Sequence, residues 1–155
     1  MRKKLVYTVT ITLLLVSCLP VFDRIPLMQI VNRTCDTILV GRSYCDNIDS
    51  ITYFVETLAG DTTEVKFKLK EDLKIVESNR IAPDSFAITD ARIYTGQSGK
   101  GYFFIFKYDS AKNHTWDEIC KNHLYDTLFV TREMLKQGNR IEYHGNKTEN
   151  KGNIE

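Results

Sequence analysis

The run Tyr102-Phe-Phe-Ile-Phe106 constrains the fold of this chain more than any other segment. Aromatic and β-branched residues favour extended backbone, and successive side chains of a strand point to opposite faces. Because this run is apolar at every position, both of its faces need burial, which predicts a central strand. The rest of the chain must therefore supply strands on either side of it.

Several shorter segments predict those strands. Leu27–Val31 and Thr37–Val40 are apolar runs joined by the turn-rich segment Asn32–Asp36, so we expect a hairpin over 27–40. Ile51–Leu58 is rich in β-forming residues, and Glu64–Lys70 alternates apolar and charged side chains with the period of a half-buried strand. Further short strands are expected at 73–77, 86–88, 92–94, 126–130 and 139–143.

The last third of the chain includes segments with helical periodicity. Thr115 and Glu118 fit a capping box at the start of a helix over 116–122, with Trp116 on its apolar face. A second short helix is predicted over 132–137. The order of elements therefore predicts a mainly β (α+β) domain, an antiparallel β-sandwich-like fold with two short helices in its C-terminal third.

The N-terminus has a different character. Arg2, Lys3 and Lys4 precede Leu5–Ser17, which is 13 residues without a charge. This order is typical of a secretory signal peptide. The apolar run is shorter than the roughly 20 residues that a membrane-spanning helix needs. Two other interpretations stay open. The segment could remain uncleaved and anchor the protein in the membrane, or an ordinary signal peptidase could remove it, with no lipid added to Cys18.

Leu15-Val-Ser-Cys18 ends this run and resembles the lipobox of bacterial lipoproteins. The resemblance implies cleavage before Cys18, a diacylglycerol thioether on its sulfur, and fatty acylation (palmitate, for example) of its new amino group. Several acyl chains make a stable membrane anchor, because each buried CH₂ contributes about 0.8 kcal/mol. No acidic cluster follows Cys18, so we expect the periplasmic side of the outer membrane in the cell envelope.

The chain of 155 residues is then organised around one domain. We expect a signal peptide over 1–17, a lipidated tether over 18–26, a β-rich globular domain over 27–143 and a flexible polar tail over 144–155. Loss of the three basic residues before Leu5 leaves 18 of the 21 basic residues against 20 acidic ones, a formal charge of −2. Such a balance gives no support to nucleic-acid binding, which needs a basic face.

Five segments near the C-terminus carry a further resemblance: 103–109 (FFIFKYD), 115–119 (TWDEI), 124–126 (LYD), 128–135 (LFVTREML) and 141–143 (IEY). Upstream, 30–34, 36–39 and 81–86 add to it. Together these segments resemble a group of small lipoproteins of unknown function from the Bacteroidetes. The group carries no activity to transfer. The resemblance implies a structural signature, with Trp116 filling the core rather than acting in catalysis.

Three cysteines remain besides Cys18. In an oxidising envelope Cys35 and Cys45 are candidates for a disulfide, although spacing alone does not fix the pairing and one thiol must remain free. Cys120 and His123, together with that pair, would supply a Cys₃His zinc set. The chain has no Cys-x-x-Cys pair, so we predict no metal site.

No catalytic motif is present in the sequence. Gly96–Gly101 departs from the phosphate-binding loop pattern, and Gly41–Cys45 lacks the second glycine of a nucleophile elbow. We therefore expect no cofactor and no enzyme, but an envelope lipoprotein whose domain is an interaction or structural module for an unknown protein or glycan. Two alternatives stay open: a small envelope hydrolase, and an immunity-type lipoprotein that binds a toxin.

Overall fold

A computed structural model describes residues 27–65, 67, 73–92, 99–136 and 138–145. The strands in these ranges are β1 (Leu27–Asn32), β2 (Ile38–Ser43), β3 (Tyr53–Phe54), β4 (Phe86–Asp90), β5 (Lys100–Lys107), β6 (Asp126–Thr131) and β7 (Arg140–Tyr143). The helices are α2 (Tyr108–Asn113), α3 (Trp116–Lys121) and α4 (Arg132–Lys136), with 3-10 turns at Ile48–Ser50 and Glu77–Asn79. The domain is mainly β with a few short helices, which confirms the predicted fold class.

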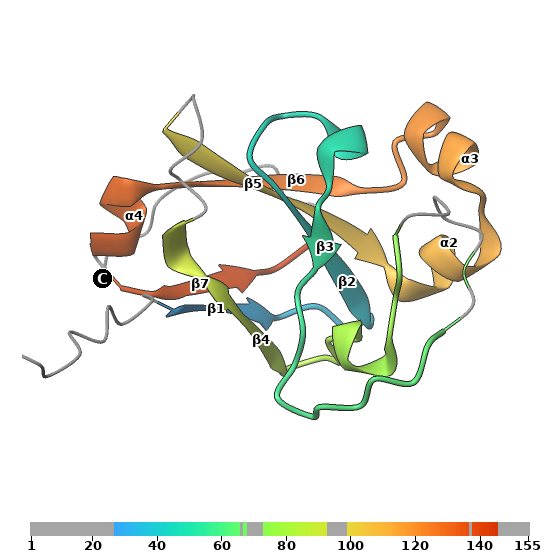
Figure 1. Cartoon of the computed structure of the whole chain (residues 1–155), viewed down its shortest axis with the longest axis horizontal. Coiled ribbons are helices and arrows are strands. Elements are labelled where there is room, and N and C mark those ends of the chain that lie inside the picture. The colour runs from blue at the N-terminus through green and yellow to red at the C-terminus, as the bar shows by residue number, and fades with distance from the viewer. Residues whose placement is uncertain (1–26, 66, 68–72, 93–98, 137, 146–155) are drawn as a thin grey trace, which may run out of the picture.

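The strands form two sheets. The smaller sheet has the order β4-β1-β7 and the larger one β3-β2-β5-β6. The β1–β7 pair is parallel, and every other strand pair of the described residues is antiparallel. In Figure 1, β1 and β7 lie side by side below β5 and β6, and α2 and α3 lie at one end of the molecule.

Two hydrophobic cores lie on opposite faces of the larger sheet. The inter-sheet core joins the two sheets and contains Met28, Ile30, Ile38, Val40, Val55, Ile81, Ala87, Ala91, Phe103, Ile105 and Val130. The helix-side core packs the outer face of the larger sheet against α2, α3 and the intervening loops; it contains Leu39, Ile48, Ile51, Phe54, Ile75, Phe104, Phe106, Ala111, Trp116 and Ile119. The larger sheet is therefore covered on both sides.

β5 contributes to both cores. Phe103 and Ile105 enter the inter-sheet core, whereas Phe104 and Phe106 enter the helix-side core, and each of the four side chains is at most 2% exposed. β2 and β6 flank it in the sheet, so the predicted central strand is confirmed. Full burial of such side chains contributes about 1.5–3 kcal/mol each, and β5 places two of them in each core.

The predicted hairpin over 27–40 is wrong, because β1 and β2 belong to different sheets. The buried Asn32 side chain fixes the corner between them. Its amide donates to the carbonyl oxygens of Asp36 at 2.7 Å and Ile81 at 3.0 Å, and its oxygen accepts from the N–H and hydroxyl of Thr34. Turn-forming residues serve hairpins and such corners alike, so composition did not separate the two.

The segment after β2 is less regular than the sequence predicts. Only Tyr53–Phe54 of the predicted strand 51–58 pairs with β2, and Glu56 then bridges Ile88 of β4 in the other sheet. Most of the predicted strands 64–70 and 92–94 lies outside the described residues, although Glu64 forms a bridge with Val76. Residues 53–56 thus close one side of the sandwich by pairing with both sheets.

The helices match the sequence except for one. α3 and α4 confirm the two predicted helices, and Thr115 and Glu118 form the predicted capping box on α3. α2 was not predicted, because the sequence has no capping residue at its start: the N-cap residue is Lys107, whose side chain makes no capping hydrogen bond. Ala111, which is 0% exposed, secures α2 to the helix-side core. Tertiary packing therefore stabilises a helix that local sequence does not signal.

Trp116 fills the helix-side core, as expected. It is 8% exposed, its ring lies 6.1 Å from the Phe106 ring between centroids, and its Nε1–H donates to Asp49 Oδ1 at 2.8 Å. The contact ties α3 both to β5 and to the 3-10 turn at 48–50. The indole therefore joins three segments that are distant in sequence.

We expect Trp116→Ala to lower the free energy of unfolding by about 3–5 kcal/mol, because it empties a large core site. Trp116→Phe is the matched control, since it keeps an aromatic ring and removes the bond to Asp49, with an expected loss nearer 1 kcal/mol from that bond. Urea denaturation of the three proteins measures both values. A loss below about 1 kcal/mol for Trp116→Ala would contradict the core role.

Candidate functional site

The predicted lipidation site, Cys18, lies outside the described residues, as do the predicted signal peptide over 1–17 and the predicted tether over 18–26. Of the predicted tail, His144 and Gly145 are described. Among the helices that the structure describes, none has the length and apolar character needed to span a bilayer. The structure therefore bears on the domain that follows the anchor motif.

The candidate disulfide between Cys35 and Cys45 is not formed, and both thiols are free and exposed. Cys35 precedes β2 and Cys45 follows it, so the whole strand separates them. Six residues of strand span about 20 Å, whereas a disulfide needs Cα atoms within about 7 Å. The two cysteines are ten residues apart along the chain, but the extended strand between them makes the distance in space too long for a disulfide.

The cysteine–histidine set is dispersed in the same way. Cys35 and Cys45 lie at opposite ends of β2, while Cys120 is half-buried in α3 beside the helix-side core. Within the described residues, no group of three or more histidine, cysteine or acidic side chains gathers as metal ligands do. The geometry offers no set of ligands to a zinc ion there.

The structure instead brings together residues from four strand ends at one end of the sandwich. Lys107 ends β5, Asp126 begins β6, Tyr143 ends β7, and Asp36 precedes β2. These side chains line two adjoining hollows with cavity volumes of about 190 and 510 Å³, which share Lys107, Asp126 and Tyr143. We call this region the strand-end hollow. Its larger part is in the size range of small-molecule pockets.

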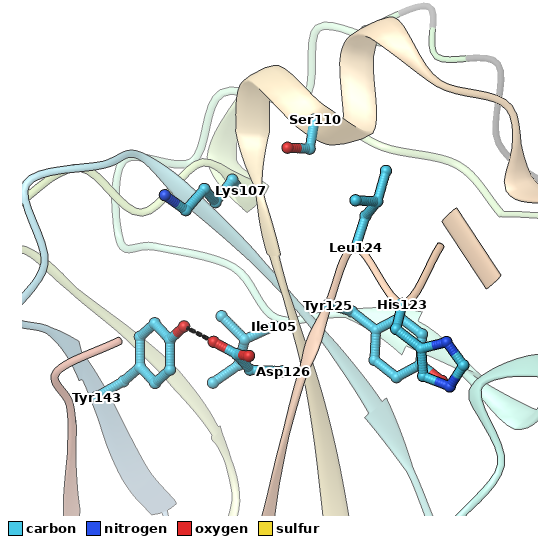
Figure 2. Close-up of a pocket in the computed structure, with 8 residues that line it drawn as sticks. All are labelled: Ile105, Lys107, Ser110, His123, Leu124, Tyr125, Asp126 and Tyr143. Carbon is cyan, nitrogen blue, oxygen red and sulfur yellow. Dashed lines mark hydrogen bonds between the residues drawn. The ribbon is translucent and has the colours of Figure 1, made fainter. Parts of the chain in front are cut away.

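Tyr143 and Asp126 form the floor of the strand-end hollow. The Tyr143 hydroxyl donates to Asp126 Oδ2, which links the edge strands of the two sheets (Figure 2). Burial of the phenol, and then its hydrogen bond to Asp126, raise the pKa of Tyr143 above its ordinary value of 10.0. The phenol therefore stays protonated in the folded protein and serves as a hydrogen-bond donor.

Charged side chains line the rim of the hollow. Lys107 Nζ lies 2.7 Å from Asp36 Oδ2, and this contact raises the pKa of Lys107. Arg33 lies 2.9 Å from Asp84 and 3.1 Å from Glu142, measured between guanidinium nitrogens and carboxylate oxygens. Exposed ion pairs of this kind contribute little to stability, so these groups are available to exchange partners with a polar ligand.

The opposite wall of the hollow comes from the end of α3. His123 has a positive φ of 51°. The Leu124 N–H donates to the Ile119 carbonyl at 3.0 Å, and the His123 N–H to the Cys120 carbonyl, which is the Schellman pattern. The His123 ring stacks on Tyr125 with centroids 5.8 Å apart (Figure 2). His123 therefore lies just past the end of α3, and it lines the hollow.

The histidine contacts do not form a nucleophile–base pair. His114 Nδ1 lies 3.0 Å from the Ser110 carbonyl oxygen, His123 stacks on Tyr125, and His144 lies 3.6 Å from Glu142. These contacts join the rings to a carbonyl, an aromatic ring and a carboxylate, whereas acyl-transfer chemistry needs a histidine on a hydroxyl or thiol. The hollow offers donors, acceptors and aromatic rings, which suit the binding of a polar ligand.

A second polar cluster lies at the other end of β2. Arg42 is 3% exposed, its guanidinium carbon lies 5.0 and 5.4 Å from the ring centroids of Tyr44 and Tyr53, and both hydroxyls accept from it. The pKa of Asp90 is lowered chiefly by hydrogen bonds from Arg92, with a smaller contribution from the Arg42 charge. Aromatic rings and a distant carboxylate thus accommodate the buried cation.

Comparison of the chain with protein-family models, with curated proteins and with solved structures finds no match.

Cys35 and His123 line the strand-end hollow and were candidates from the sequence, but Lys107, Asp126 and Tyr143 were not. Lys107, Asp126 and Tyr143 are separated by up to 36 residues and share no spacing pattern. They meet because β5 and β6 pair antiparallel, whereas β7 runs parallel to β1 in the opposite sheet. The one available signal was position, since each polar residue lies at the end of a predicted strand.

We expect Tyr143→Phe to lower the free energy of unfolding by about 1–3 kcal/mol near neutral pH, because a hydrogen bond to a charged group is lost while the ring remains. The pKa of Tyr143 is raised on folding, so the unfolded chain releases this proton first. The stabilisation is therefore complete below about pH 10 and declines above it. Denaturant unfolding at about pH 8 and about pH 11 should show that the difference in unfolding free energy between wild type and Tyr143→Phe becomes smaller at the higher pH. An equal difference at both pH values would contradict the stabilising hydrogen bond from Tyr143 to Asp126.

Proposed function

We propose that this chain is a lipid-anchored protein of the bacterial cell envelope, with a β domain that binds a partner without catalysing a reaction. The observation that carries the proposal is the order of Arg2–Lys4, the uncharged run Leu5–Ser17 and Cys18. A charged start, an apolar run too short to span a bilayer and a terminal cysteine together support export and lipidation. The resemblance to small lipoproteins of the Bacteroidetes points the same way.

The position of the strand-end hollow supports a binding role. Eight residues, 19–26, separate Cys18 from Leu27, where β1 begins. Fully extended, these eight residues span at most about 30 Å. The loop Arg33–Asp36 lies at the far end of β1, about 20 Å from Leu27. A chain tethered at Cys18 therefore has the hollow at the end of β1 away from the tether.

The contents of the hollow favour binding over catalysis. Lys107 supplies a donor, the Asp126 carboxylate has further lone pairs, and the Tyr125 ring offers a flat apolar surface. A polar partner with exposed hydroxyl or amide groups, such as a glycan or a protein loop, matches this mixture. We place the protein on the periplasmic side of the outer membrane, because the residues after Cys18 lack an acidic cluster.

Cys18→Ser tests the anchor in the full chain expressed in a bacterial host. We expect the variant to lose labelling by a fatty-acid precursor, since the thioether cannot form. It should also no longer be found among the lipid-modified proteins of the membrane fraction. Cys45→Ser is the matched control, because it removes an exposed thiol of the folded domain and should keep full labelling. Fatty-acid labelling of Cys18→Ser at the wild-type level would overturn the proposal.

A further inference from the structure

β6 is an edge strand of the larger sheet with one side unpaired. All six of its residues pair with β5, from Ile105↔Asp126 to Lys100↔Thr131. The strand pairings of the described residues place no neighbour on its other side. Alternate backbone N–H and C=O groups along this side are therefore open to another strand.

The other edge strands carry protection that β6 lacks. β3 has only two residues, β7 has four residues that include Arg140 and Glu142, and β4 is bridged by Glu56 at Ile88. β6 is longer and reads Asp-Thr-Leu-Phe-Val-Thr, without lysine, proline or glycine. Phe129 at its centre is 37% exposed. Proteins usually blunt such an edge or pair it.

The sequence around Phe129 is chemically symmetric. Thr127 and Thr131 lie two residues to either side of it, Leu128 and Val130 lie next to it, and Asp126 is matched by Arg132. Two antiparallel copies of this segment centred on Phe129 would pair threonine with threonine, leucine with valine, and aspartate with arginine. Cross-strand pairs of these kinds are favourable. The complementarity is of the segment with itself.

We propose that a second copy of this chain binds along β6, with the two β6 strands antiparallel and Phe129 on the twofold axis. The axis is normal to the sheet, so each face of the sheet continues across it. Leu128 and Val130 of the two copies then lie together on the face that carries the inter-sheet core. On the other face the two Phe129 side chains meet; within one copy, Lys100 Nζ lies 4.9 Å from the centroid of the Phe129 ring. The two four-stranded sheets become one continuous sheet.

The charges at the ends of the segment fix the register. Asp126 already accepts from Tyr143, and a carboxylate has about four acceptor sites. It can therefore also pair with Arg132 of the second copy, which is exposed at the start of α4. A shift of two residues in either direction would lose both of these ion pairs. The inference rests on the sheet edge and is independent of the lipid anchor.

Cysteine cross-linking tests this dimer in the full chain in isolated membranes or lysate. The background carries Cys18→Ser, Cys35→Ser, Cys45→Ser and Cys120→Ala, so that the introduced cysteine is the single thiol of the chain. Phe129→Cys should give a dimer on a non-reducing gel after mild oxidation, because directly opposed strand residues have Cα atoms about 4.5–5.5 Å apart. Reductant should return it to monomer.

Thr127→Cys and Thr131→Cys are the matched controls. Each alone should stay monomeric, since each lies about 13 Å along the strand from its own copy. The two variants co-expressed with different tags should cross-link to each other. The proposal would be overturned if the Phe129→Cys protein stays monomeric on the gel although its resistance to protease shows that it is folded. A disulfide-linked dimer of Thr127→Cys alone would overturn it as well. If Phe129→Cys fails to accumulate, the mixed pair decides: a cross-link supports the dimer and none contradicts it.

Discussion

The burial of both faces of β5 is the constraint on which the rest of the structure depends. Phe103 and Ile105 hold the smaller sheet against the larger one, and Phe104 and Phe106 hold α2, α3 and the loops on the other face. Because successive side chains of a strand alternate, one apolar run fixes three layers at once. The positions of β2 and β6 follow, since a strand buried on both faces needs a neighbour on each side.

Features set by local chemistry could be predicted from the sequence. The central strand, the capping box of Thr115 and Glu118, and the burial of Trp116 follow from period, capping and size. Features set by long-range pairing could not. The corner at Asn32 has the composition of a hairpin turn, and only its bonds to Asp36 and Ile81 reveal that the chain changes sheets.

The candidate site shows the same division. Lys107, Asp126 and Tyr143 meet through strand pairings that no spacing in the sequence encodes. The candidate disulfide between Cys35 and Cys45 does not form, because β2 holds the two cysteines apart. The proposed functions use different parts of one strand: the start of β6 supplies Asp126 to the strand-end hollow, and its open edge supplies the dimer contact. Asp126 takes part in both proposed contacts.

Native-state hydrogen exchange tests the central role of β5 most directly. Amides of a strand that secures both cores should open only with global unfolding, whereas edge strands open locally at lower free energy. We predict that the amides at 103–106 are protected to the global free energy of unfolding and exchange more slowly than those of β4 and β7. Exchange of these amides at the rate of the edge strands, by local opening, would contradict the account.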